Sequence, residues 1–141
     1  MIVVAIISIL ATIALPAYQT YVAKATITSI ISTAATGKLP ILRYYVEYGE
    51  MPHASTVRNY SYLSSFDEIM KTQLPGGSQG AAYWSATPTS SRYRVILQGI
   101  NGNVNGRRIW FFYEDSGDAF NMRCVPQSGL DNKYLPKMCH R

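Results

Sequence analysis

The stretch that decides the fold opens the chain and runs MIVVAIISILATIALPAYQTYV, from Met1 to Val22. It carries no charged side chain, and its polar side chains before Tyr18 are the hydroxyls of Ser8 and Thr12. A helix of about 20 apolar residues is long enough to cross the hydrocarbon core of a bilayer. Because the stretch is apolar on every side, it lacks the polar face of a core helix in a soluble domain. The sequence therefore predicts a membrane-type helix over residues 1–22. A cleavable signal peptide fits poorly, because no basic region precedes the apolar run and no A-x-A site follows it.

A proline interrupts this apolar run. Pro16 lacks a backbone donor, and its ring clashes with the carbonyl group one turn earlier, so we expect a kink or local melting there. Over residues 23–48 the apolar side chains recur at the spacing of one helical face, which predicts an amphipathic second half of the same helix. We expect this half to be weakened over Gly37–Pro40 and to end near Gly49.

The globular part, residues 49–141, combines loops with strands. Its first section is rich in turn-forming residues and predicts one short helix from Ser65, as its N-cap, to about Thr72. The apolar period then changes to two, which predicts four strands joined by short loops, at 82–87, 93–98, 108–113 and 119–125. One face of this antiparallel meander needs cover, and the amphipathic helix supplies it with a face formed by Ile27, Ile30, Ile31, Ala34 and Leu42. The predicted fold class is α+β: a long N-terminal helix packed on a four-stranded antiparallel sheet, with the tyrosines packed between helix and sheet.

Composition excludes several classes of protein. The chain has 141 residues, which suits one domain, and its 48% hydrophobic residues with 11 tyrosines exclude a disordered chain. Only 15% of residues are charged, all of them from Lys24 onward, and the net charge is +5. The composition therefore fits one folded domain with a bare apolar extension.

No pattern of side chains predicts an enzyme or a metal site. His53 and His140 are isolated from one another in the sequence. The acidic pairs Asp67-Glu68 and Glu114-Asp115 are neighbours along the chain, so on a strand they point to opposite faces, and in turns they are solvated. The two cysteines lack the spacing of zinc ligands. We expect no enzymatic activity, no metal and no cofactor.

The two cysteines, Cys124 and Cys139, lie close together near the C-terminus. In a chain with a membrane-type segment, such an isolated pair favours one disulfide formed in an oxidising compartment. The alternative is a pair of reduced cytosolic cysteines. A small globular part would gain materially from a covalent link.

These two ends of the chain resemble those of type IV pilins of the IVa class. Met1–Tyr18 matches the N-terminal signature of that family almost residue for residue, and Cys139 within Pro136–Cys139 resembles the end of its disulfide-bounded C-terminal loop. The resemblance implies the pilin fold with a disulfide between Cys124 and Cys139. It also implies that the numbered chain lacks the first few residues of a mature pilin, which begin with an N-methylated phenylalanine and include a glutamate. Ser8 stands where the family usually has glycine.

The resemblance implies a structural role. A major pilin polymerises into an extracellular filament on the bacterial surface, used for adhesion, twitching motility and DNA uptake. The helix would anchor the subunit in the inner membrane and then pack against other copies in the filament. The expected assembly residues are Met1, Val4, Ile7, Ser8 and Pro16. The expected partners are other copies of the chain, the inner membrane, the pilus assembly machinery, and a host surface or DNA. Hydropathy alone leaves open a single-span anchor for an exported domain.

Basic side chains gather towards the C-terminus, with His140 among them. These candidate anion contacts are Arg107, Arg108, Arg123, Lys133, Lys137 and Arg141. A positive surface repeated along a filament can bind DNA or another anionic polymer, because affinity for phosphates grows with the number of cations engaged. The commoner outcome is a solvated charged face. Two alternatives therefore remain: a minor or DNA-receptor pilin that uses this surface, and a pseudopilin of type II secretion, against which the cysteine loop speaks.

Overall fold

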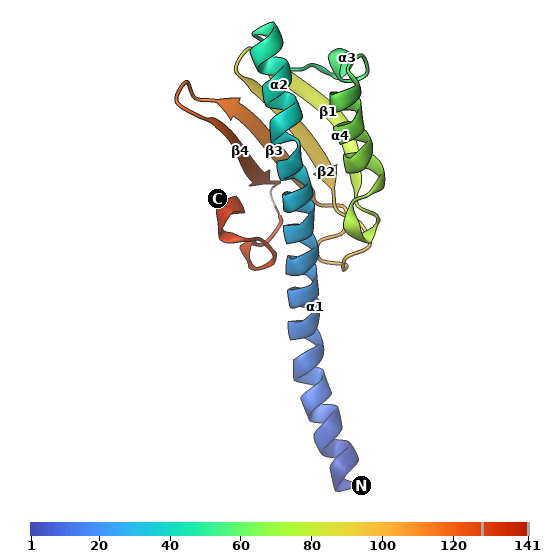
Figure 1. Cartoon of the computed structure of the whole chain (residues 1–141). Coiled ribbons are helices and arrows are strands. Elements are labelled where there is room, and N and C mark those ends of the chain that lie inside the picture. Colours follow the sequence, from blue (N-terminus) through green and yellow to red (C-terminus); the bar gives the residue numbers. More distant parts are fainter. Residues whose placement is uncertain (128, 141) are drawn as a thin grey trace.

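The computed structural model describes residues 1–127 and 129–140, with the side chains of residues 81–86 left out. A long helix runs the length of the molecule, and the other elements pack on its second half (Figure 1). The helices are α1 (Ile2–Thr36), α2 (Lys38–Tyr48), α3 (Ala54–Val57) and α4 (Ser61–Thr72). The strands are β1 (Gln79–Thr87), β2 (Ser90–Ile96), β3 (Arg108–Asp115) and β4 (Phe120–Pro126). The described residues also include three single 3₁₀ turns, one before β1 and two after β4: η1 (Pro75–Gly77), η2 (Asn132–Tyr134) and η3 (Lys137–Cys139).

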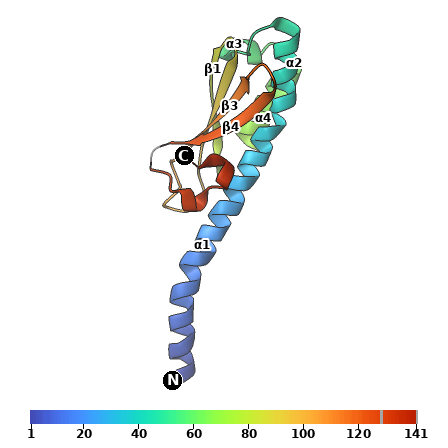
Figure 2. The same cartoon turned by 90° about the vertical axis from the view of Figure 1, so that its left-hand side faces the viewer.

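Pro16 lies inside an unbroken helix. α1 runs from Ile2 to Thr36 with the proline in its interior, and the ribbon bends gently along its first half in both views (Figures 1 and 2). A proline removes one intrahelical hydrogen bond, and the bonds on either side of it can hold the helix together. Of the two expected outcomes, a kink or local melting, the continuous helix excludes melting for this subunit.

α1 and α2 form one nearly continuous rod that is joined at Gly37. Gly37 has helical dihedral angles, φ −67° and ψ −13°, so the axis continues across the junction. The weak point predicted over Gly37–Pro40 is confirmed as the boundary between the two helices. α2 ends at Tyr48 and is capped by Gly49, where φ is 73°, so it ends near Gly49 as its pattern predicts.

The four strands form an antiparallel meander in the order β1-β2-β3-β4, which confirms the predicted topology. Their bounds differ from the predicted ones at several ends. Thr87 pairs with Ser90, so the turn between the first two strands is tight and β2 begins earlier than residue 93. Strand pairing, which the pattern of a single strand does not contain, sets these ends.

The short helices were predicted incompletely. α4 begins at Ser61 rather than at Ser65, and α3 was not predicted. The hydroxyl of Ser65 donates to the carbonyl oxygen of Ser61 over 2.7 Å, so it bonds back inside the helix instead of capping its start.

The core lies between the helices and one face of the sheet. Ile27, Ile30 and Ala34 on α1 are fully buried, as predicted, and so are the inward-facing side chains of β2 and β3. The buried hydroxyl of Tyr113 donates to the carbonyl oxygen of Ala34 over 2.7 Å. On α2 the fully buried residue is Ile41, whereas the predicted Leu42 is only half-buried. We call residues from Ala23 onward the head.

Candidate functional site

The first part of α1 projects from the head as a bare arm, Met1–Val22. Every residue from Met1 to Gln19 is exposed, and the first buried side chain is Ala23. The structure places all the predicted assembly residues on this arm: Met1, Val4, Ile7, Ser8 and Pro16. By length and composition the helix could cross a membrane, and none of its most apolar window is buried. An apolar surface this large needs lipid or another apolar surface to cover it.

The hydroxyl groups of serine and threonine in the arm bond within the helix. Ser8 and Thr12 donate to carbonyl oxygens one turn earlier, each over 2.8 Å, and Thr20 donates to the carbonyl oxygen of Pro16 over 3.0 Å. An unbonded polar group in an apolar environment would cost several kcal/mol. The arm can therefore enter lipid or a dry protein interior without leaving these hydroxyls unsatisfied.

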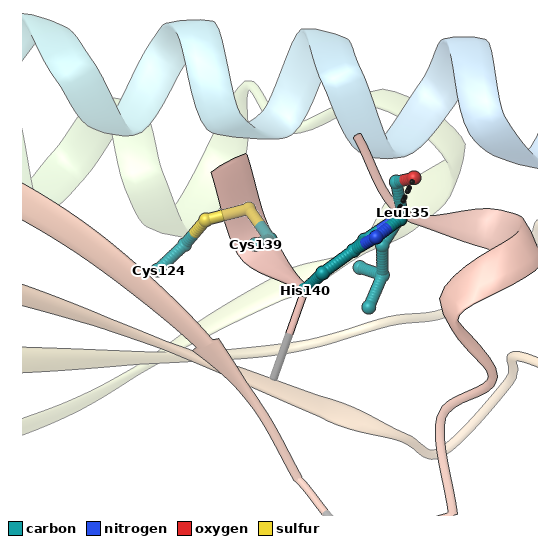
Figure 3. Close-up of a disulfide and its surroundings, with 4 residues drawn as sticks. All are labelled: Cys124, Leu135, Cys139 and His140. Atoms are coloured by element: carbon teal, nitrogen blue, oxygen red, sulfur yellow. Dashed lines mark hydrogen bonds between the residues drawn. A yellow bond between two sulfur atoms is a disulfide. The ribbon is translucent and has the colours of Figure 1, made fainter. Parts of the chain in front are cut away.

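A disulfide closes the C-terminal segment onto β4. Cys124 and Cys139 are bonded, with their Cα atoms 5.1 Å apart, which confirms the predicted pairing (Figure 3). The segment is also held by polar contacts, since Nε2 of His140 lies 3.1 Å from the carbonyl oxygen of Leu135. Leu135 is fully buried. The turn η2 packs against α1, so the C-terminal segment supports the helix where it enters the head.

The predicted basic cluster separates into two groups. Arg108 lies on β3 and Arg123 on β4, on the face of the sheet that points away from the helices. We call this face, formed on β2, β3 and β4 by residues that alternate with the core positions, the outer face. The second group lies on the chain between strands and after β4. Its described members are Arg107, Lys133 and Lys137, all exposed. Arg141 lies outside the described residues.

Two arginines that the sequence reasoning missed also lie on the outer face. The guanidinium carbons of Arg92 and Arg94 lie 5.6 and 5.7 Å from the ring centre of Trp110 on the neighbouring strand. In the same way, Arg123 lies 4.6 Å from the ring centre of Phe112. A cation over the face of an aromatic ring is attracted to that ring electrostatically. The alternate spacing of Arg92 and Arg94 was the signal in the sequence that they share one face of a strand. Only the register of β2 against β3 brings them beside Trp110.

The carboxylate of Glu114 reduces the positive charge of the outer face. Glu114 accepts from Arg123 over 2.7 Å, and this hydrogen bond raises the pKa of the Arg123 guanidinium. Arg123 on this face is therefore paired with Glu114. The face is therefore a cationic and aromatic surface of modest net charge.

Tyrosines form a second cluster that the sequence reasoning placed differently. Tyr93 and Tyr113 pack between helix and sheet, as predicted. Near the end of α2, by contrast, Tyr44 stacks on Tyr48 with ring centres 4.6 Å apart, and Tyr60 lies 5.2 Å from both. Hydrogen bonding to Tyr60 raises the pKa of Tyr48. The tip of the head is therefore aromatic and hydrogen-bonded.

Metal binding finds no support in the described part of the chain. Within residues 1–127 and 129–140, no group of three or more His, Cys, Asp or Glu side chains is placed to hold a metal ion.

Comparison with known proteins assigns the chain to a family. No family-level sequence profile matches it. It is 45% identical over 149 residues to the type IV major pilin protein PilE1 of Neisseria gonorrhoeae, covering 99% of this chain and 82% of that protein. It is 46% identical over 150 residues to the fimbrial protein of Neisseria meningitidis serogroup B, covering 99% and 88%. The fimbrial protein EcpC of Eikenella corrodens is 33% identical over 146 residues, covering 99% and 84%.

The matches extend over nearly the whole chain, so they include the bare arm, the sheet and the disulfide-closed segment alike. These features are the ones that the resemblance at the two ends predicts. The chain belongs to the type IV pilins, the structural subunits of pili.

Proposed function

We propose that this chain is a major pilin whose arm, Met1–Val22, holds the subunit in the inner membrane and later packs in the centre of the pilus. The observation that carries the proposal is the arm itself, which is apolar all round and uncovered by the head. Both environments satisfy the same requirement, because lipid and neighbouring arms each remove apolar surface from water. Relationship to pilins implies a structural rather than an enzymatic role.

The assembled filament would lie on the bacterial surface and present the head to its surroundings. Adhesion and twitching motility are the uses consistent with this family. The assembly machinery, a host surface and DNA are the further partners that we propose. The two charged groups of the head and its aromatic tip are the chemical features that such a filament would repeat at every subunit.

A pair of substitutions tests the role of the arm. Ile13 on the arm and Val46 on α2 are similarly exposed in the subunit, at 71% and 77%, so neither contributes to the core. Ile13→Lys should abolish sedimentable filaments in cells, because a charge in an apolar interior is costly. Val46→Lys is the matched control and should assemble. Normal filaments from the Ile13→Lys chain would contradict the proposal.

A second function, binding of anionic polymers such as DNA, is favoured by the outer face. Arg92 and Arg94, at alternate positions of β2, present cations beside the ring of Trp110, and such surfaces combine phosphate attraction with stacking. Removing cations that contact phosphates should lower the affinity and flatten its dependence on salt, by roughly one unit of slope for each cation.

The test compares two double variants of the filament. Arg92→Gln/Arg94→Gln removes the cations of β2, and Arg43→Gln/Arg58→Gln removes two exposed cations near the tip. DNA retention by sedimented filaments should fall for the first variant and persist for the second. Equal retention by both variants would assign DNA binding, if any, to another surface.

A further inference from the structure

The arm and the head meet at a boundary that fixes where a membrane surface would lie. The uncharged apolar run ends at Val22, just before Lys24, the first charged side chain of the sequence. The first buried side chain, Ala23, follows at once. An anchored subunit would therefore have the lower end of its head at the level of the lipid headgroups. This step rests on the membrane anchoring proposed above.

The side chains at this boundary are those typical of a membrane surface. Tyr18 and Tyr21 are 67% and 73% exposed at the end of the apolar run, and Tyr21 shares a shallow groove with Lys24. Tyrosines are enriched where the hydrocarbon core meets water, and a lysine there can extend its ammonium group to the headgroups. The side chains of the helix therefore place the membrane surface at the same level at which the head begins with the buried Ala23.

Two segments of the head come down to this level beside the helix. They are the loop 97–107 between β2 and β3 and the turn η2, which lie at the end of the head nearest the arm in both views (Figures 1 and 2). They support each other, since the amide of Asn103 donates to the hydroxyl of Tyr134 over 3.2 Å. We call these two segments, together with Lys24, the underside.

The underside is cationic. Lys24 and Arg107 are exposed, and the side chain of Lys133 is 56% exposed, with its ammonium 5.0 Å from the ring centre of Tyr134. Among the described residues of these segments and the turn into η2, the carboxylate is Asp131, which lies 3.4 Å from the Lys133 ammonium. Both partners are exposed, and exposed ion pairs are worth little in water, so Lys133 can exchange this partner for a phosphate.

The opposite end of the head carries most of the negative charge. Five of the eight acidic residues lie on the end of α2 and on the hairpin between β3 and β4, namely Glu47, Glu50, Glu114, Asp115 and Asp118. The hydroxyl of Tyr45 on α2 donates to Asp115 on that hairpin, so these acids share one end. Such a charge distribution turns the cationic underside towards an anionic surface and the acidic end away from it.

We propose that the underside, formed by Lys24, Arg107 and Lys133, is a docking surface for anionic phospholipid headgroups and holds the head against the membrane before assembly. Each cation near an anionic surface contributes about a fivefold change in association. The contact would restrict tilting of the head about its arm. Because it is electrostatic, it would weaken as salt shortens the range of the attraction.

The test uses the full chain, one copy per lipid nanodisc, in phosphatidylcholine or in an equal mixture with phosphatidylglycerol. Amide hydrogen exchange of residues 97–107 and 129–140 should be severalfold slower in the mixed discs. Lys24→Gln/Lys133→Gln should remove that difference, at about fivefold per cation. Arg43→Gln/Arg58→Gln, which removes two exposed cations near the tip, should retain it. Arg107 is left intact because its guanidinium packs against Gly129.

Three outcomes would overturn a claim, and they are distinguishable. Equal exchange in both discs, with the chain retained in each, overturns the docking surface and leaves the anchor intact. Failure of the chain to remain with either disc contradicts the anchoring under the proposed function. Protection that needs two copies per disc and ignores lipid charge would assign the underside to the acidic end of a neighbouring subunit and overturn the lipid assignment.

Discussion

At the scale of single residues, Gly37 controls how closely α4 approaches the helical rod. A Cβ atom built at Gly37 would clash with the ring of Phe66, which is 3% exposed and contacts the rings of Tyr93 and Tyr113. Several aromatic side chains would have to move together to make room, and overpacking of a core costs about 1–3 kcal/mol. A glycine at this position therefore serves packing as well as the helix junction.

We expect Gly37→Ala to lower the free energy of unfolding. Alanine gains up to about 1 kcal/mol of helix propensity over glycine, so the net loss is at most about 2 kcal/mol. Thermal melting of the full chain in mild detergent, followed by circular dichroism, measures the change. Gly102→Ala is the control, because nothing lies within 4 Å of a Cβ there. A Gly37→Ala protein that melts no lower than the control would contradict the clash.

The disulfide is the second residue-scale prediction. Cys124 and Cys139 enclose a separation of 15 residues, and a loop of that size contributes about 3 kcal/mol in the chain-entropy treatment. Cys124→Ser/Cys139→Ser should lower the free energy of unfolding by this order and reduce the yield of surface filaments. Intact mass without reductant verifies the bond in the parent protein. Unchanged melting of the double variant would show that the buried contacts of the C-terminal segment hold it in place without the disulfide, and would contradict this prediction.

At the scale of elements, the hairpin between β3 and β4 is tied to α2 through a carboxylate. The backbone amide of Gly117 donates to Asp115 over 3.0 Å and the Tyr45 hydroxyl donates over 2.8 Å. These two bonds, the backbone one first, hold the pKa of Asp115 below its usual value. A lowered pKa in the folded state gives stability that is present above the unfolded pKa near about 3.9 and is lost as pH falls through the folded value.

We therefore expect the melting temperature to decline below about pH 4 and Asp115→Asn to flatten part of that decline. The measurement is thermal melting between neutral and acidic pH. Asp118→Asn, on the same hairpin and exposed, is the control. If both variants kept the full acid sensitivity of the parent protein, the tie between hairpin and helix would not be its source.

The arm is the element that assembly should change. In the subunit it is a continuous helix in spite of Pro16. The proline leaves the carbonyl group of Thr12 without its intrahelical donor, which weakens the helical turn before Pro16. We expect residues from Ser8 to Pro16 to depart from regular helix in the filament, which would lengthen the arm because helical rise is only about 1.5 Å per residue. A filament map with straight, regular helix from Ile7 to Tyr18 would contradict this.

Sequence pattern predicted the elements that depend on local period and missed those that depend on pairing. The arm, the meander and the buried stripe through Ile27 and Ala34 follow from periods of 3.6 and two. Contacts between distant segments decide the remaining features. They set where β2 begins, place Ile41 rather than Leu42 in the core, and bring Arg92 over the ring of Trp110. The grouping of the basic residues at the candidate site could not be predicted for the same reason. Arg108 and Arg123 lie on strands and the others lie outside them, and only the folded sheet separates these two groups.

At the scale of the whole molecule, the chain divides its tasks between arm and head. The arm is uncovered in the subunit, whereas the head has a complete core that begins at Ala23. Burying one isoleucine or leucine side chain contributes about 1.5–3 kcal/mol, so an arm rich in such residues outweighs any contact of ordinary size between heads. The arm should therefore set the cohesion of the filament, and the heads should set its surface chemistry.

The last prediction follows from where the core begins. Removing Met1–Tyr21 should leave a soluble, monomeric head whose melting temperature is close to that of the full chain in detergent, because only exposed or half-buried positions are lost. A longer deletion that includes Lys24 would also remove Ala23, which is fully buried, and should melt lower. Sedimentation measures the association state, and circular dichroism measures folding. A shorter-deletion head that fails to fold would show that the arm stabilises the core. One that still forms long filaments would transfer the cohesion of the pilus from the arm to the heads.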